Sequence, residues 1–316
     1  MDKIKRDFYV GVFWSFASAF LWSTTFVTSR YLMGNKFIDP VSLSFIRFIV
    51  GGILLFGYGY LFMRTKLLTV KAKDFLQLAV LALFGVVGMS VFLFFGQQST
   101  TAINSSMIMQ INPVIIFFLC LFIGEKATIG QFIGIIISLL GCLLVVDVIT
   151  VKGFAYDFNH IGGDLIILAS AACWAIYSVF GKTAVRRLGG FAVTTWTMLL
   201  GALELFVILL FMPGERFLPE ASSLWTWSVI AYLCVFPTAV AFFAWFEAMD
   251  KINMSLLNVM QYLTPAFTIL LAYMLLGEKI SPLNAFGIIL VISGVVLIGL
   301  KSRKVTAEEL VKEPAS

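Results

Sequence analysis

The sequence has 316 residues, of which 60% are hydrophobic and only 12% are charged, and its mean hydropathy is +1.00. Soluble domains carry roughly twice that share of charged residues, so the composition excludes an ordinary water-soluble fold and indicates a chain whose solvent is lipid. The net charge of +5 does not indicate nucleic-acid binding, because most basic residues lie in short gaps between apolar segments.

Ten apolar segments, each long enough to cross a bilayer, follow one another along the chain. They lie at about 9–31, 41–63, 75–96, 102–123, 129–149, 163–183, 191–212, 225–247, 254–276 and 282–300. The connections between them are too short to be domains, and residues 301–316 form a charged tail. The sequence therefore predicts an all-α membrane protein with ten transmembrane helices. The first helix is expected to be retained, because no convincing signal-peptide cleavage site follows the basic N-terminus.

The cysteines and the single histidine give no metal or disulfide pattern. All four cysteines lie inside apolar segments, which is typical of small buried residues, and His160 lies in a loop. A histidine-based metal site is therefore not expected, and the sequence predicts no cofactor.

The distribution of basic residues predicts the orientation in the membrane. Fifteen Lys and Arg residues fall in the segments on the side of the N-terminus, against four on the other side. Loops rich in Lys and Arg stay in the cytoplasm. We therefore expect a multi-pass protein of the cytoplasmic (inner) membrane, with both termini and the tail 301–316 in the cytoplasm.

The two halves of the sequence resemble each other at an offset of 152–153 residues. The segment FASAFLW at 16–22 matches LASAACW at 168–174, and Gly124-Glu125-Lys126 matches Gly277-Glu278-Lys279. Each half holds five segments, so the second copy enters the membrane upside down. The sequence thus predicts two inverted five-helix repeats, at 9–149 and 163–300.

An inverted repeat has a functional consequence. Two copies of one unit give two near-equivalent packings, one open to each side of the membrane, with a substrate site near the midplane between the halves. The architecture therefore favours a transporter that works by alternating access, and it leaves the substrate open.

The same residues carry a family resemblance. Pro113, followed by Gly124-Glu125-Lys126 and a glycine-spaced helix, recurs as Pro265 and Gly277-Glu278-Lys279. This pattern resembles the EamA-domain family of the drug/metabolite transporter superfamily, as two tandem units over nearly the whole chain. The resemblance implies an inner-membrane carrier that exports amino acids, amines or other metabolites. It also implies a central cavity lined by helices 1, 3, 4, 6, 8 and 9.

Aromatic and amide side chains within the spans are the candidates for binding a substrate. Trp22 and Trp174 lie in mid-span, although tryptophan prefers the interfaces; they either face each other across a cavity, with Tyr177 one turn beyond, or fill space between helices. Amides in hydrocarbon need partners, so the polar residues before the two prolines either bind substrate or bond neighbouring helices. These residues are Gln110, Asn112, Asn258, Gln261 and Tyr262.

Four charges within or at the ends of the spans are candidates for coupling or gating. Arg47 and Glu204 are the deepest and lie at comparable depth, so a mutual ion pair is conceivable. Arg47 is interpreted as a structural or gating residue, and Glu204 as the better candidate for proton coupling. Arg30 and Lys182 either reach toward opposite interfaces or form a symmetric pair of gate charges.

These observations favour a secondary transporter of a small neutral or zwitterionic metabolite, with an exported amino acid as the first guess. The alternative is a proton-coupled exporter of cationic amines or drugs that uses Glu204; a channel and a non-transporting receptor stay open. An intramembrane enzyme is not expected, because the motifs of aspartyl and metalloproteases are missing from the sequence. The expected partners are the substrate, the lipid bilayer and, through glycine-rich helix faces, either a neighbouring helix or a second copy in a homodimer.

Overall fold

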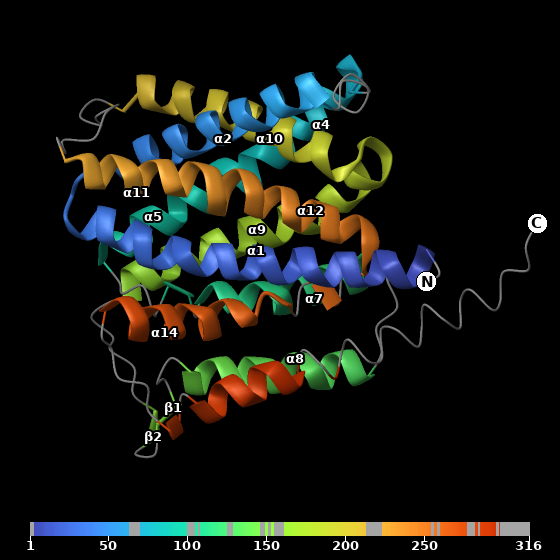
Figure 1. Ribbon diagram of the computed structural model, residues 1–316, viewed down its shortest axis with the longest axis vertical. Coiled ribbons are helices and arrows are strands. Elements are labelled where there is room, and N and C mark those ends of the chain that lie inside the picture. Colours follow the sequence, from blue (N-terminus) through green and yellow to red (C-terminus); the bar gives the residue numbers. More distant parts are fainter. Residues whose placement is uncertain are drawn as a thin grey trace, which may run out of the picture.

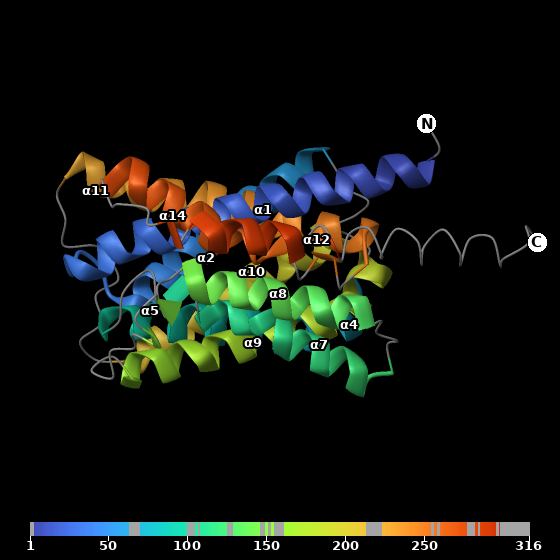
Figure 2. The same cartoon turned by 90° about the horizontal axis from the view of Figure 1, so that it is seen from below.

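The computed structural model is a bundle of helices that lie side by side along one common direction (Figures 1 and 2). It describes residues 3–62, 70–99, 105–106, 108–124, 129–145, 149–150, 153–154, 161–212, 223–253, 256–257, 260–276, 282–283, 285–294 and 297. The predicted tail 301–316, together with His160 and the motifs at 125–126 and 277–279, lies outside this range.

The first half of the chain contains the following elements. They are α1 (Lys3–Gly34), α2 (Pro40–Phe62), α4 (Ala72–Ala82), η1 (Leu83–Gly88), α5 (Met89–Ser99), η2 (Met109–Ile111), α7 (Asn112–Phe122) and α8 (Ile129–Val145). The six residues of η1 are π-helical, and they join α4 to α5 in one continuous helix from Ala72 to Ser99. A single 3-10 turn, η2, leads into α7.

The second half begins after a short hairpin of β1 (Ile149–Thr150) and β2 (Gly153–Phe154). Its helices are α9 (Ile161–Leu188), α10 (Gly190–Leu210), α11 (Leu224–Cys234), η4 (Val235–Val240), α12 (Ala241–Lys251), α14 (Leu263–Leu276) and an apolar helix at Ala285–Gly294. As in the first half, a π-helical segment, η4, lies within one continuous helix, here from Leu224 to Lys251.

Local sequence signals explain several helix ends. Pro40 opens α2, a position where its missing N–H costs nothing. The carboxylate of Asp74 accepts a hydrogen bond from the backbone N–H of Lys71 at 3.0 Å and so caps the start of α4. Gly189 alone separates α9 from α10; its φ of 85° lies in the left-handed region, which glycine adopts without strain.

The outer surface of the bundle is rich in apolar side chains. Large apolar side chains point outward on many helices, for example Phe13 (61% exposed), Leu61 (68%) and Phe122 (88%). Within the described residues, six helices are long and apolar enough to cross a membrane, and three shorter apolar helices accompany them. The protein is therefore a multi-pass membrane protein, because such a surface is stable only in lipid.

The fold agrees with the all-helical expectation except for one detail. The only strands in the described part of the chain are the two residues each of β1 and β2. Ten spans, their inverted arrangement and the units 9–149 and 163–300 stay predictions, because six helices of the described residues reach membrane length.

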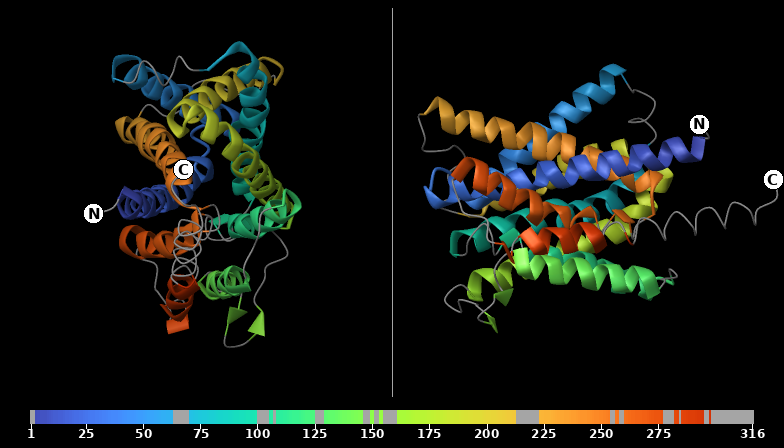
Figure 3. Two further views of the ribbon diagram at one scale, coloured as in Figure 1. Left: turned by 90° about the vertical axis from the view of Figure 1, so that its right-hand side faces the viewer. Right: turned by 60° about the horizontal axis from the view of Figure 1, so that its bottom comes forward.

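One helix pair shows what the predicted glycine faces do. α8 and the helix Ala285–Gly294 lie together at one edge of the bundle (Figures 1 and 3). A Cβ added to Gly141 would lie 2.8 Å from the carbonyl oxygen of Gly287, and one added to Gly294 would meet Ser138. These glycines therefore allow two helices of the same chain to approach backbone to backbone.

The bundle has two ends. At the end where α1 begins, which we call the N-terminal end, Gly11 of α1 packs against Ile252 after α12, and α4 begins beside the end of α9. At the opposite end, α1 finishes beside the end of α5 through Ser29 and Gln97.

Candidate functional site

An aromatic cluster occupies the centre of the bundle. The rings of Trp22 (α1) and Trp174 (α9) are in edge-to-face contact, with centroids 5.1 Å apart. Phe242 of α12 contacts both rings, at 5.6 and 5.4 Å, and Trp245 one turn further contacts both at 5.3 and 5.8 Å. The two tryptophans thus face each other, and we call these four residues the aromatic cluster.

A cavity that is partly open to solvent adjoins this cluster. Its apolar lining consists of Trp22, Phe26, Met89, Leu93, Met109, Trp174 and Phe242. Its polar lining consists of Thr25, Arg47, Gln110, Gln261 and Thr264. Helices 1, 3, 4, 6, 8 and 9 of the expected ten all contribute, as the family resemblance implies, and α2 adds Arg47.

Two of the lining amides stand where a helix is interrupted. Gln110 lies in the 3-10 turn η2, directly before Asn112 and Pro113 at the start of α7. Gln261 lies in a turn before α14, four residues ahead of Pro265, and its carbonyl oxygen accepts the N–H of Thr264 at 2.9 Å. Proline has no N–H to donate to the preceding turn, but the carbonyl oxygens of Met109 and Gln261 accept the N–H groups of Asn112 and Thr264 instead. The groups that stay available beside the cavity are therefore side-chain amide atoms of Gln110 and Gln261.

The two π-helical segments also lie beside the cavity. Met89 directly follows η1, and Phe242 follows the end of η4 by two residues. A π-helical segment inserts an extra residue in the turn and re-aims the side chains that follow it, and such segments are frequent at functional sites. The two π-helical segments therefore help to direct apolar side chains into the lining of the cavity.

Arg47 is the charged residue of the lining, and its surroundings differ from the predicted ones. Its side chain is 2% exposed, and its Nε donates a hydrogen bond to the hydroxyl of Thr238 in η4. The guanidinium carbon lies 5.3 Å from the ring centroid of Phe48 and 5.8 Å from that of Phe94. Both rings offer cation–π contacts to the charge.

The conceivable ion pair between Arg47 and Glu204 does not form. α2 and α10 run side by side, with Phe45 against Phe206 at 5.8 Å, so the two charges do lie at a similar level. Arg47 nevertheless turns toward Thr238, and Glu204 is half-buried on α10 without lining the cavity. Comparable depth on neighbouring helices did not fix the direction of the side chains.

Several buried polar atoms of the lining have no hydrogen-bond partner among the described residues. They are Nη1 of Arg47, Oε1 of Gln110, Nε2 of Gln261 and Oγ1 of Thr25. Nε1 of Trp245 in the aromatic cluster also has no hydrogen-bond partner among the described residues. Buried polar groups normally bond to protein, water or ligand, so these donors and acceptors of the lining can bind a ligand in the cavity.

The other predicted binding residues that the structure describes, Tyr177, Asn112 and Tyr262, are not among the lining residues of the cavity. Tyr177 is buried, shares a hydrogen bond with Thr197 at 3.1 Å and packs its ring against Gly85. Asn112 and Tyr262 are fully buried. Asn258 lies outside the described residues.

The predicted gate charges Arg30 and Lys182 stand at opposite ends of the bundle. Arg30 donates a hydrogen bond to the carbonyl oxygen of Gln97 at 2.8 Å, and Ser29 donates to the side-chain oxygen of Gln97 at 2.9 Å. Gln97 is completely buried. Lys182 is half-buried near the end of α9.

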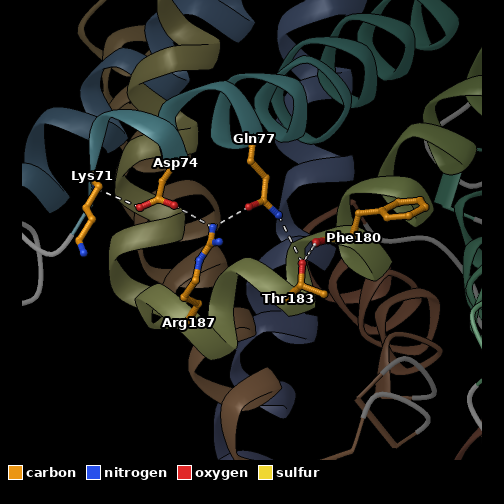
Figure 4. A network of polar contacts seen from close by, with 6 residues as sticks. All are labelled: Lys71, Asp74, Gln77, Phe180, Thr183 and Arg187. Carbon is orange, nitrogen blue, oxygen red and sulfur yellow. Dashed lines mark hydrogen bonds and ion pairs between the residues drawn. The ribbon is translucent and has the colours of Figure 1, made fainter.

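A polar network ties α4 to α9 at the N-terminal end (Figure 4). The carboxylate of Asp74, which is 4% exposed, pairs with Arg187 at 3.0 Å. Arg187 also donates to the side-chain oxygen of Gln77 at 2.7 Å, whose amide nitrogen donates to Thr183 at 3.3 Å. We call Asp74, Gln77, Thr183 and Arg187 the α4–α9 clamp; it joins the first half of the chain to the second.

Sequence reasoning missed part of the site. Phe26, Met89, Leu93 and Phe242 are ordinary apolar residues of a span, and only the packing reveals which of them face the cavity. Thr25 could have been found from the repeat, because it corresponds to Tyr177 at the offset of 152 residues, and Tyr177 was a predicted binding residue beside Trp174. In the described part of the chain, no three His, Cys, Asp or Glu side chains are grouped so that they could hold a metal ion.

Membrane-length helices around a cavity that combines aromatic and amide groups are typical of a polytopic transport protein. The sequence profile of the EamA-like transporter family matches residues 9–147 and 161–300. The chain belongs to the EamA-like transporter family, and the expected membership is confirmed.

Individual relatives agree with this assignment. An uncharacterized transporter of Archaeoglobus fulgidus is 29% identical over 287 residues, which cover 90% of this chain and 95% of that protein. A probable terminal-alkyne amino-acid exporter of Streptantibioticus cattleyicolor is 28% identical over 287 residues, covering 89% and 90%. A crystal structure with 22% sequence identity superposes with a TM-score of 0.74 and covers 95% of this chain and 99% of that one, which shows a shared fold.

Proposed function

We propose that this protein is a secondary transporter that moves a small neutral or zwitterionic metabolite, with an amino acid favoured, out of the cell by alternating access. The observation that carries the proposal is the cavity beside the aromatic cluster. It joins apolar walls to unpartnered amide and hydroxyl groups, and Arg47 is its charged lining residue. Such a lining suits a ligand with an apolar part and few charges.

The name of one relative supports the choice of substrate class. That protein is a probable amino-acid exporter and resembles this chain over most of its length. A multiply charged anion, such as a sugar phosphate, would require several basic residues in the cavity, whereas Arg47 stands alone among the described lining residues.

The conformation fits one stage of an alternating-access cycle. Toward the N-terminal end, the cavity is followed by the aromatic cluster, by Tyr177 packed on Phe246 at 5.4 Å, and by the α4–α9 clamp. Thr25 and Leu93 line it on the other side, toward the ends of α1 and α5. With the N-terminus in the cytoplasm, as the basic residues predict, this is a state closed to the cytoplasm.

Counterflow in proteoliposomes tests the proposal. Vesicles preloaded with an unlabelled apolar amino acid should accumulate the labelled form transiently, because a carrier exchanges solutes one for one. Saturable counterflow with at least one member of a panel of amino acids supports the carrier. Flux that never saturates would indicate a channel, and no flux above protein-free vesicles would contradict the proposal.

The second candidate is a proton-coupled exporter of cationic amines, and one observation favours it. Oε2 of Glu204 is buried within α10 and has no partner among the described residues. If this carboxyl group carries the coupled proton, Glu204→Gln should abolish amine transport driven by a pH gradient while leaving the protein folded. Unchanged gradient-driven transport in that variant removes the second candidate.

A further inference from the structure

We propose that Arg47 binds the carboxylate of an α-amino acid with an apolar side chain, and that Gln110 accepts a hydrogen bond from its ammonium group. This assignment deepens the proposed function, on which it rests, and it changes the role of Arg47 from gate to substrate binding.

The first observation in support of this assignment is the buried charge of Arg47. A guanidinium remains charged inside a protein, and an uncompensated charge within a membrane span is costly. Its hydrogen-bond partner, Thr238, is neutral, and none of the described carboxylates forms an ion pair with it. The cavity therefore holds a buried positive charge, and a ligand anion would stabilise it directly.

The second observation is the geometry of the Arg47 side chain. The hydroxyl of Thr238 accepts from Nε and donates to the carbonyl oxygen of Leu233 at 2.6 Å, so its position is fixed from both sides. The rings of Phe48 and Phe94 flank the guanidinium. Nε is thus engaged, while Nη1 is buried and has no partner among the described residues. A carboxylate is the acceptor that best matches such a group.

Another part of the lining supplies an acceptor for a cation. The side-chain nitrogen of Gln110 donates to the carbonyl oxygen of Ser106 at 3.1 Å, which fixes the orientation of the amide. Its oxygen then remains without a partner among the described residues, as does the hydroxyl oxygen of Thr25. Both atoms accept hydrogen bonds, so the cavity presents a charged donor and neutral acceptors, as a zwitterion requires.

The remaining lining of the cavity favours an amino acid whose side chain is apolar. Phe26, Met89, Leu93 and Met109 join the aromatic cluster to form an apolar wall. A polar side chain would lose its water there without gaining partners. A simple amine is disfavoured for a different reason, because it would bring a second positive charge into the cavity of Arg47.

The first test compares ligands on the wild-type protein in nanodiscs, by isothermal titration calorimetry. The probes are alanine, valine, leucine, methionine and phenylalanine, together with the corresponding amides, which lack the carboxylate charge. At least one amino acid should bind, and its amide should bind about 30-fold more weakly or worse. Absence of binding for all five amino acids, or equal binding of acid and amide, would overturn the assignment.

The second test changes Arg47 itself. Arg47→Gln should lower the affinity for the amino acid about 30-fold or more and should not lower the affinity for its amide, which is a cation that Arg47 repels. Arg186→Gln, on an exposed arginine near the end of α9, is the matched control and should bind like the wild type. Equal losses for acid and amide would assign Arg47 a structural role. If Arg47→Gln does not fold, the ligand comparison on the wild type still decides.

The two proposals fail in different ways. Selective binding of amino acids without counterflow would contradict transport and leave the role of Arg47 intact. Counterflow of an amine by a protein that binds none of the amino acids would overturn the role of Arg47 and leave transport intact.

Discussion

At the scale of single residues, Trp174 is the most connected member of the candidate site. Its ring contacts Trp22, Tyr177, Phe242 and Trp245 at 5.1 to 5.8 Å, and it is 3% exposed. It therefore contributes both to the stability of the bundle centre and to the wall of the cavity.

Substitution of Trp174 separates these two contributions. Trp174→Ala should destabilise the protein by about 3–5 kcal/mol, because a large buried ring leaves a cavity. Trp174→Phe keeps an aromatic ring and should retain most of the stability while weakening ligand binding. Thermal unfolding in detergent and calorimetric titration with the bound amino acid measure the two effects. A Trp174→Ala protein that melts with the wild type would show that the ring is not packed as described.

Gly85 allows Tyr177 to approach the backbone of η1. A Cβ at this position would collide with the ring of Tyr177, so Gly85→Ala should destabilise the protein by about 1–3 kcal/mol. Gly57 of α2 is the matched control, since nothing lies within 4 Å of a Cβ added there. The midpoints of thermal unfolding of Gly85→Ala and Gly57→Ala provide the comparison, and equal midpoints would refute the close approach.

Residue types alone predicted only part of the site. Trp22 and Trp174 could be paired from sequence because they occupy matching positions at an offset of 152 residues. The hydrogen-bond partners of Arg47 and Gln97 could not be predicted from sequence, because the direction of a side chain depends on how its helix is rotated about its own axis. Thr238, which fixes Arg47, is an inconspicuous threonine until η4 places it there.

At the scale of elements, the two π-helical segments are the main surprise. η1 begins at Leu83 and η4 at Val235, and this separation of 152 residues equals that of the matching tryptophans. Hydrophobic periodicity does not reveal a single widened turn inside an apolar span, so the sequence predicted only uninterrupted helices. Segments of this kind mark places where a helix bends, and both stand next to the cavity.

The α4–α9 clamp is the element-scale contact most open to experiment. Arg187→Gln should destabilise the protein by about 1 kcal/mol, because Arg187 is half-exposed while the carboxylate of Asp74 is buried. Asp74→Asn, combined with Arg187→Gln in a double-mutant cycle, isolates the pair, and Arg186→Gln serves as control. The thermal unfolding midpoints of the four proteins give the coupling. Strictly additive effects would show that the ion pair does not join the two helices.

At the scale of the whole molecule, composition and apolar segment length predicted a membrane protein built almost entirely of helices. The segment 41–63 is the helix Pro40–Phe62, and 163–183 lies within Ile161–Leu188. The bilayer requires about 20 apolar residues in every helical span, which is why such estimates succeed. The segments near Pro113 and Pro265 contain the 3-10 turn η2 and a turn at 261–262, which the sequence did not predict, and part of each segment lies outside the described residues.

Thiol labelling inside the cavity tests the central claim, that the cavity lies on the route by which solute crosses the membrane. Thr25→Cys, introduced after replacement of the four native cysteines, places one thiol in the cavity wall. In proteoliposomes, a membrane-impermeant reagent should react with it from either face, be slowed by the bound amino acid, and stop counterflow. Reaction from one face only, or undiminished counterflow after complete labelling, would contradict the account.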